Sequence, residues 1–444
     1  DHLVPASQLD DTRHFRIGNE FVEKYGMKNI HRSDGICHQL MTEAGYVKPG
    51  NIVFGTDSHT TTYGCVGAFS SGIGYTEMAS ILGTGTLWIR VPETIKVNIT
   101  GKLPDNVMAK DIILKLIGDL GADGATYKAL EFAGDTVENM SVASRMSMSN
   151  MAIEAGAKCA LFTPDEKTAE YCEIELTDEQ KDLVGDSDAV YSRVINYNAE
   201  DLVPVMACPS NVDNVKPVSE IEGKEIDQVF IGSCTNGRLE DLMAAAEILK
   251  DKHVAPFVKL IVTPASRKIY RQAVENGTME ILSKAGAIIT HPSCGLCCGR
   301  TGGILTDGET VVATNNRNFL GRMGTSKVGI YLASPKSAAA CAVAGKIDAG
   351  RGSLQHGGKS GNGIHAGGLD GVGRRIVGGG YLIDNAAAAE RGEIDDLGAG
   401  HLAVGLQNEL PVKGFDLRVR QGDLAHNAGR AAHFDLIAGR EWMG

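Results

Sequence analysis

Two kinds of hydrophobic pattern alternate along the chain. Short apolar runs rich in Val and Ile are typical of strands buried on both faces, whereas apolar residues that recur every three to four positions are typical of helices. Their alternation predicts an α/β fold with mostly parallel sheets. The predicted strands are residues 51–55, 94–100, 228–232, 258–263, 287–290, 310–313 and 328–332, and the predicted helices are residues 109–120, 147–156, 239–249, 268–276 and 336–345.

Prolines and composition divide this pattern into four segments. Pro92 precedes a new strand, and the prolines between Pro204 and Pro217 interrupt the pattern a second time. Of the 55 glycines, 21 lie after residue 350, where the ratio of Lys to Arg also inverts. The expected segments are three α/β domains and then a Gly-rich extension of doubtful fold, at residues 1–93, 94–205, 206–350 and 351–444.

The overall charge and the cysteine content exclude some classes of protein. A formal net charge of −12 argues against a protein that binds nucleic acid through a basic surface. The sequence contains no run of 18 apolar residues and no signal segment, so we expect a soluble, cytoplasmic protein. Ten cysteines in 444 residues are too few for a disulfide framework, and such cysteines bind metals, act in catalysis or are simply buried.

Three cysteines follow predicted strands. Cys234 comes after residues 228–232, and Cys294 and Cys297 come after residues 287–290. Because ligands of open α/β sheets bind beyond the carboxyl ends of strands, we expect both loops at one crevice. A C-x2-C pair with a third, distant cysteine can form a three-thiolate metal site with one open position. The spacing alone leaves an iron–sulfur cluster, a zinc ion and metal-free thiols equally open.

A second group of residues, within the first 60, joins histidines to carboxylates. Histidines beside carboxylates can titrate near neutral pH and transfer protons. A single histidine in a strand-end loop is more often structural, and for this group we weigh the two interpretations equally. Ser58 next to His59 does not make a hydrolase triad, whose members come from separate positions. The members of this group are Asp1, His2, His38, Asp57 and His59.

Two further pairs are candidates for substrate binding or for support of a metal site. Arg317 and Arg322 follow the strand predicted at 310–313, and two guanidinium groups can bind a di- or tricarboxylate, although a solvated loop has the same composition. Asn150 and Glu154 lie four residues apart on a predicted helix and so share one of its faces. That face is either an ordinary solvent face or an outer shell of a metal site.

Five strings in order resemble the aconitase superfamily, namely FGTDSHT, SNMAIEAGAK, IGSCTNGRLEDL, PSCGLC and NRNFLGR. Within it, the chain is most similar to the large subunits of 3-isopropylmalate dehydratase and prokaryotic homoaconitase, from Asp1 to about Gly350. The resemblance implies an aconitase-like three-domain α/β/α core, here without part of the first domain, since relatives carry a further segment before Asp1. It implies a hydro-lyase that moves a hydroxyl group between adjacent carbons of a 2-hydroxy di- or tricarboxylic acid. The first candidate is the dehydratase reaction of leucine biosynthesis.

The resemblance also implies a role for each candidate residue. A 4Fe-4S cluster is held by Cys234, Cys294 and Cys297, and its fourth iron binds the substrate. Asp1 and His2 protonate the departing hydroxyl group. The catalytic residues so implied are Asp1, His2, His38, Asp57, His59 and Glu154. The residues implied to lie around the substrate are Ser58, Asn150, Asn236, Asn316, Arg317 and Arg322.

The base that removes the C–H proton is not among these residues. In the family it is a serine of a swivel domain, and the signature Ser-Ser-Arg-Glu-His of that domain is absent from this chain. The resemblance therefore implies a small-subunit partner that supplies the catalytic serine. Homoaconitase and dimethylmalate dehydratase are close alternatives. An alternative from another class is a non-catalytic, iron-responsive RNA-binding protein, against which the charge of −12 counts.

Overall fold

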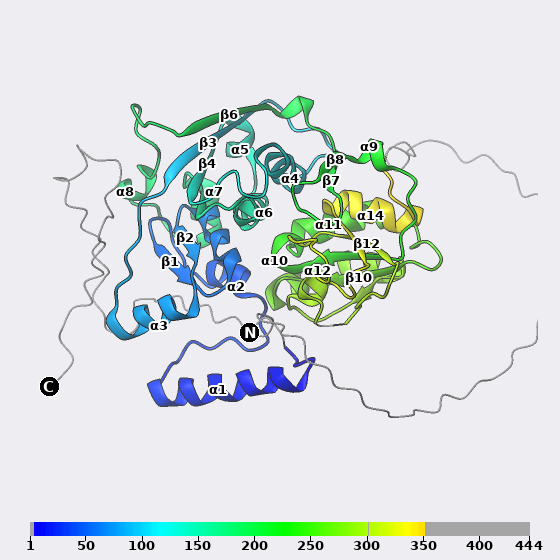
Figure 1. Ribbon diagram of the computed structural model, residues 1–444, viewed down its shortest axis with the longest axis horizontal. Helices are drawn as coiled ribbons and strands as arrows, with labels where there is room; N and C mark the ends of the chain where they lie inside the picture. The colour runs from blue at the N-terminus through cyan, green and yellow to red at the C-terminus, as the bar shows by residue number, and fades with distance from the viewer. Residues whose placement is uncertain (1–3, 301, 351–444) are drawn as a thin grey trace, which may run out of the picture. The chain divides into compact units, whose positions relative to one another are not determined.

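A computed structural model describes residues 4–300 and 302–350, all of which belong to one compact unit (Figure 1). The predictions for Asp1, His2 and the extension at residues 351–444 lie outside the described residues. In the described part, an α/β architecture with mostly parallel sheets is confirmed. The division of the first 350 residues into three domains stays a prediction.

The largest sheet among the described residues has seven strands, in the order β11-β10-β9-β12-β13-β7-β8. The first five run parallel, and β7 and β8 form an antiparallel edge. The central strands β9 and β12 are buried along their whole length, as expected of apolar strands covered on both faces. The strands are β7 (Val205–Ala207), β8 (Val215–Pro217), β9 (Gln228–Gly232), β10 (Lys259–Thr263), β11 (Ile288–Ile289), β12 (Thr310–Ala313) and β13 (Gly329–Leu332).

Helices connect and cover these strands. The longer ones, α11 and α14, pack against each other and against β9, and they bury alanine-rich faces that allow close approach. The helices of this part are α9 (Val218–Ile221), α10 (Ser233–Asn236), α11 (Leu239–Leu249), α12 (Arg267–Glu275), α13 (Thr278–Lys284), η4 (Gly295–Cys298) and α14 (Pro335–Ala344).

A second sheet has four parallel strands in the order β5-β4-β3-β6. Alternate residues of β3 are buried, including Ile95 and Val97, so one face of this sheet is apolar. These residues share one hydrophobic cluster with Phe230 and Val311 of the larger sheet, so a continuous core joins the two sheets. The elements are β3 (Glu93–Thr100), α4 (Ala109–Leu120), β4 (Lys128–Ala133), α5 (Asp135–Asn139), α6 (Val142–Met151), η2 (Ala152–Ala155), β5 (Cys159–Phe162), α7 (Glu166–Cys172), α8 (Asp178–Lys181), β6 (Arg193–Asn198) and η3 (Ala199–Asp201).

The N-terminal part packs a buried 3-10 helix, η1, against α6 and β5. Gly64 of η1 has no room for a side chain, because a Cβ there would lie 1.7 Å from the Ala160 oxygen. Only glycine therefore lets η1 lie directly on β5. The elements are α1 (Leu9–Tyr25), α2 (Cys37–Glu43), β1 (Ile52–Gly55), η1 (Ser58–Val66), β2 (Phe69–Gly72) and α3 (Tyr75–Thr84), with β1 and β2 paired in parallel.

Most predicted elements have nearly the observed bounds, and one differs in a way that matters for the site. The helix expected at 147–156 begins at Val142 and tightens into the 3-10 helix η2 at Ala152. Asn150 therefore lies on α6 and Glu154 on η2, and both side chains contact residues of one element, Thr62 and His59 in residues 58–66. Among the described residues, every helix is too short or too polar to span a bilayer.

Candidate functional site

The three cysteines lie in loops at the carboxyl ends of two strands of the seven-stranded sheet. Cys234 lies in α10, directly after β9, and Cys294 and Cys297 lie at η4, after β11. Gly232 makes the turn out of β9 possible, because its φ is 154° and a Cβ there would lie 2.3 Å from the Thr263 oxygen. Cys234 and Cys297 are buried, and Cys294 is partly exposed. The two loops lie close together, as predicted.

Two asparagine amides contact the cysteine sulfurs. The Asn150 amide nitrogen donates to the Cys234 sulfur at 3.3 Å, and the Asn316 amide nitrogen lies 3.7 Å from the same sulfur. The Cys297 thiol donates to the Asn316 amide oxygen at 3.5 Å. The two amides also bond to each other, at 3.2 Å. Asn316, which follows β12, therefore bridges the two cysteine loops.

Two other predicted residues have different surroundings. The Arg322 guanidinium lies 3.7 Å from the Cys297 sulfur, so it faces the cysteines. The Asn236 amide nitrogen donates to Ser147 at 3.2 Å and to Asp241 at 2.9 Å. Asn236 is therefore turned toward α6 and α11, and neither of these two bonds is made to a cysteine.

The chemistry and spacing of the donors test which metal group the site fits. Burial raises the pKa of Cys234 and Cys294, so these thiols need a bound metal centre to be held as thiolates. Three sulfurs on one zinc ion would lie about 3.8 Å apart, because Zn–S bonds are about 2.3 Å long and tetrahedral. We compared this distance with the spacing of all possible metal ligands, namely histidine nitrogens, cysteine sulfurs and carboxylate oxygens. In the described residues, the only group of three ligand atoms within 4.8 Å of one another belongs to His38, Asp57 and His59. The sulfurs of Cys234, Cys294 and Cys297 therefore do not all lie within 4.8 Å of one another, which fits a cluster with several irons better than a single zinc ion.

A histidine–carboxylate pair lies at the start of η1. The His38 ring nitrogen Nε2 lies 2.8 Å from the Asp57 carboxylate, which also accepts from the His59 backbone N–H at 2.7 Å. Burial disfavours the charged imidazole, but the charges of Cys37 and Asp57 outweigh it and raise the pKa of His38 well above its usual value. The same pairing lowers the pKa of Asp57 against the effect of burial. The structure thus holds a buried ion pair here.

The network continues from His59 to Glu154 and Arg317. The His59 Nε2 lies 2.9 Å from the Glu154 carboxylate, which accepts from Arg317 Nε at 2.9 and 3.1 Å. Arg317 Nη2 donates to the Ser58 hydroxyl at 2.9 Å. Burial raises the pKa of Glu154, but the hydrogen bond from His59 and the charge of Arg317 outweigh it, so the pKa is lowered. The carboxylate is ionised at neutral pH.

One short path connects this network with the cysteines. Asn150 donates to the Thr62 hydroxyl at 2.9 Å, and that hydroxyl donates to the His59 backbone oxygen at 2.6 Å. Three elements that are far apart in sequence, η1, α6 and α10, therefore meet at the site. Of these, α6 and α10 lie side by side in Figure 1. This arrangement places ionisable histidines and carboxylates beside the cysteine loops.

Two buried cations near the site were not among the sequence candidates. Arg238 donates to the backbone oxygens of Cys234 at 2.6 Å and Thr235 at 2.7 Å, so it holds the cysteine loop. Lys110 of α4 donates to the backbone oxygens of Thr314 at 2.9 Å and Asn315 at 2.6 Å. A signal for Lys110 does exist in the sequence, because it occupies the first position of an apolar stripe at 110, 113, 114 and 117.

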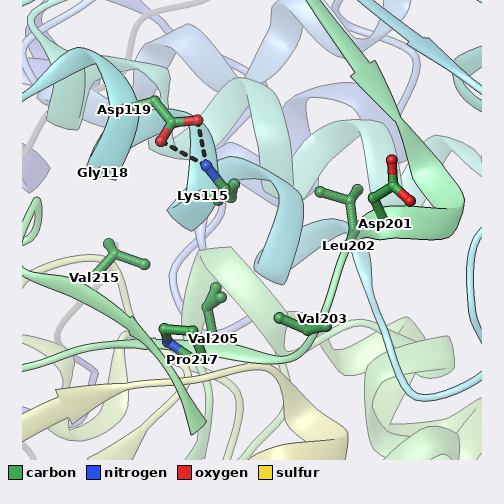
Figure 2. A pocket seen from close by; sticks show the side chains of 9 residues that line it. All are labelled: Lys115, Gly118, Asp119, Asp201, Leu202, Val203, Val205, Val215 and Pro217. Atoms are coloured by element: carbon green, nitrogen blue, oxygen red, sulfur yellow. Dashed lines mark hydrogen bonds and ion pairs between the residues drawn. The ribbon is translucent and has the colours of Figure 1, made fainter. Parts of the chain in front are cut away.

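A cavity of about 250 Å³ lies elsewhere, between α4 and the β7–β8 edge. Figure 2 shows its apolar wall of valine, leucine and proline and the Lys115–Asp119 ion pair at its rim. None of its lining residues belongs to the cysteine site or to the histidine–carboxylate network. The lining residues are Lys115, Gly118, Asp119, Asp201, Leu202, Val203, Val205, Val215 and Pro217.

Comparison with known proteins gives a consistent picture. The chain matches the model of the Aconitase family (aconitate hydratase) over residues 6–224 and 216–345. The 3-isopropylmalate dehydratase large subunit 1 of Methanopyrus kandleri is 50% identical over 348 residues, which are 78% of this chain and 83% of that protein. A probable 3-isopropylmalate dehydratase large subunit of Methanothermobacter thermautotrophicus has the same identity and coverage.

Relatives with another substrate in their name are almost as similar. The probable methanogen homoaconitase large subunit of Methanothermobacter thermautotrophicus is 46% identical over 350 residues, 79% of this chain and 82% of that protein. Among solved structures, aconitase X of Thermococcus kodakaraensis in its holo form aligns with 67% of this chain and 69% of its own. With a TM-score of 0.41 and an identity of 14%, this similarity is too weak to support a conclusion about the fold or the function.

Proposed function

Because the chain belongs to the aconitase family, whose hydro-lyases use iron–sulfur clusters, we propose that it is a 3-isopropylmalate dehydratase large subunit. Cys234, Cys294 and Cys297 hold its 4Fe-4S cluster. The observation that carries the proposal is the bridge made by Asn316, which contacts the sulfurs of Cys234 and Cys297 and donates to the Asn150 amide. The amide N–H groups of Asn150 and Asn316 are directed at the Cys234 sulfur, and such donation stabilises a thiolate ligand.

The roles of the chain's own residues follow from the network. When bound, the cluster supplies an iron that acts as a Lewis acid on the substrate hydroxyl group. Glu154, ionised and 2.9 Å from the His59 ring, can take up the proton that a water molecule releases as its hydroxyl group adds to the substrate, and return that proton when the group leaves. Arg317 uses Nε for Glu154 and Nη2 for Ser58, which leaves Nη1 to bind a substrate carboxylate.

The partner is part of the same proposal. The relatives are named large subunits, which implies a small-subunit partner. In our proposal that small subunit supplies the serine that removes the C–H proton, as the resemblance to the family implies. The hydroxyl group then leaves one carbon and returns to its neighbour.

The test is anaerobic reconstitution with iron and sulfide, followed by addition of a small subunit and an isopropylmaleate substrate. We expect a brown protein that hydrates this substrate. Cys234→Ser should lose both the colour and the activity, whereas Cys298→Ser is the matched control, since Cys298 lies in the same loop as Cys297 but is not a proposed ligand. A colourless wild-type protein that contains zinc would contradict the proposal.

Homoaconitase activity is the second candidate, and the similarity to homoaconitase large subunits favours it. The two activities share the cluster and the proton network, so they differ only in the side chain of the substrate. Parallel assays with isopropylmaleate and with homoaconitate on the same reconstituted complex distinguish them. A kcat/KM for homoaconitate above that for isopropylmaleate would replace the first candidate with the second.

A further inference from the structure

Lys110 is a cation in an unusual position. Its side chain is fully buried at the second residue of α4, and a positive charge at a helix N-terminus opposes the helix dipole. Among residues 4–300 and 302–350, it forms hydrogen bonds to two backbone oxygens and no ion pair with a carboxylate. Buried lysines are rare unless a partner charge stabilises them. The negative charge that stabilises the Lys110 ammonium group must therefore come from a group to which Lys110 is not hydrogen-bonded.

The two backbone oxygens belong to the loop that carries the cysteine bridge. Thr314 and Asn315 directly precede Asn316, whose amide contacts the sulfurs of Cys234 and Cys297. Lys110 reaches this loop from the helix of the four-stranded sheet, more than 200 residues away in sequence. Its two bonds, at 2.9 and 2.6 Å, thus fix the backbone from which Asn316 extends.

The charges near Lys110 point to the cysteines as its partner. Burial lowers the pKa of Lys110 to about 7, and the charges that act most strongly in the opposite direction are those of Cys297 and Cys234. Asp111, its neighbour in sequence, raises this pKa less than either cysteine does. Its carboxylate accepts hydrogen bonds from the backbone N–H groups of Met108 and Val205. Thiolates on a metal centre are a permanent negative charge.

We propose that Lys110 is a positioning residue of the cysteine site: it fixes the Asn316 loop and places a buried positive charge behind the metal-bound thiolates. This inference rests on the proposed function, because it requires a cluster on Cys234, Cys294 and Cys297. Lys110 does not contact the substrate in this scheme. Its effect on the reaction passes through Asn316 and through the charge of the cluster.

The experiment compares Lys110→Met with Lys115→Met, a matched change on the exposed side of the same helix. Both variants and the wild type are reconstituted anaerobically with iron and sulfide, and the cluster is followed by its visible absorption and its reduction potential. In Lys110→Met we expect cluster loss in air to be about tenfold faster, as for other residues that support metal ligands. We expect its reduction potential to be more negative, because a nearby positive charge is lost. With the small subunit added, kcat should fall while KM stays within about twofold.

Further measurements separate this role from a general structural one. The cluster-free Lys110→Met protein should unfold within about 5 °C of the wild type, because a buried charge is removed together with its bonds. Lys110→Gln keeps a donor for the loop but no charge, so it should restore kcat in part and leave the potential shifted. If Lys110→Met does not fold, Lys110→Gln takes its place in every measurement.

Three outcomes would overturn the inference. The first is an unchanged cluster lifetime and potential in Lys110→Met, and the second is an equal change in Lys115→Met. The third is loss of the fold in both Lys110 variants while Lys115→Met folds, which would make Lys110 a requirement of the fold alone. A wild-type protein that forms no cluster would instead contradict the proposed function, so the two failures are distinguishable.

Discussion

The two halves of the candidate site differ in whether their charged groups are paired with opposite charges. In the histidine–carboxylate network, His38 is paired with Asp57 and Arg317 with Glu154, so each of these charges has an opposite charge within 3 Å. At the cysteines, the groups that contact the sulfurs are neutral amides and the Arg322 guanidinium. The first half is electrically complete, whereas the second has excess positive charge around thiols.

This difference shows what each half is prepared to do. Paired charges hold protons at fixed positions and can exchange them with a substrate at little electrostatic cost. Amides and cations around thiols stabilise the thiolate form, which is the form that binds metal. Changes in the network should therefore affect the chemistry and leave the cluster, and changes at the cysteines should affect the cluster first.

The largest effect is expected for Glu154→Gln. The amide keeps the shape of the side chain but cannot accept a proton, so kcat should fall by about 10³-fold, within the usual range for an acid–base group. Cluster content and its visible spectrum should remain those of the wild type. Glu247→Gln, on the exposed surface of α11, is the control. A kcat within threefold of the wild type would remove Glu154 from the chemistry.

A smaller effect, on stability alone, is expected where a buried cation outside the site has a carboxylate partner. Arg145 of α6 is fully buried, and Asp165 accepts from both of its terminal nitrogens. Asp165→Asn leaves this charge without its partner, at a cost of about 2–3 kcal/mol in unfolding free energy, below the range for fully buried pairs because Asp165 is one-third exposed. Chemical denaturation measures the loss.

The pH dependence of this loss has a definite sign. Burial raises the pKa of Asp165, but the hydrogen bond from Arg145 outweighs it, so the pKa lies below its ordinary value of 3.8. A lowered pKa contributes stability above pH 3.8 that is lost as the pH falls through the folded-state pKa. The difference between wild type and Asp165→Asn should be constant from pH 5 to 8 and shrink below pH 4. A difference that grows in acid would contradict this pairing.

At the cysteines, Asn316→Asp tests the excess of positive charge. It exchanges the amide donor for a carboxylate of the same shape, 3.7 Å from the Cys234 sulfur. We expect about tenfold faster loss of the cluster and a more negative reduction potential. Asn316→Ala, which removes the amide without adding charge, should give the smaller shift in potential. If the two variants behave alike, the charge at this position is unimportant.

The sequence allowed the five parallel strands of the larger sheet and the meeting of the two cysteine loops to be predicted, because apolar runs and positions directly after strands are local signals. The edge strands β7 and β8 were missed, since they lie in the proline-containing stretch that was expected to interrupt the pattern. Family membership, expected from five strings, is confirmed by the family match and by relatives about 50% identical. The support for the cysteine loops was not foreseen. Lys110 lies more than 200 residues from the loop it binds, so its role depends on how α4 packs and not on any neighbour in sequence.

The helix segment that carries Asn150 and Glu154 shows a second limit. Their spacing of four residues predicts one shared helix face. Both side chains do face η1, where Asn150 bonds to Thr62 and Glu154 to His59, but α6 tightens into η2 between them. A 3-10 turn at a helix end depends on tertiary contacts and has weak sequence signals. The shared side could therefore be predicted from the spacing, and the change of helix type could not.

The smallest effect is expected for Lys115→Met, five residues beyond Lys110 on the same helix. Lys115 lies 2.6 Å from both oxygens of Asp119, shorter than most ion pairs, yet its side chain is 41% exposed. Solvent screening and side-chain entropy offset this attraction, so the unfolding free energy should change by less than about 0.5 kcal/mol. That change should vanish in 1 M salt. A loss above about 1 kcal/mol would mean that distance, and not burial, decides how much a charge on α4 matters, and the contrast between Lys110 and Lys115 would then fail.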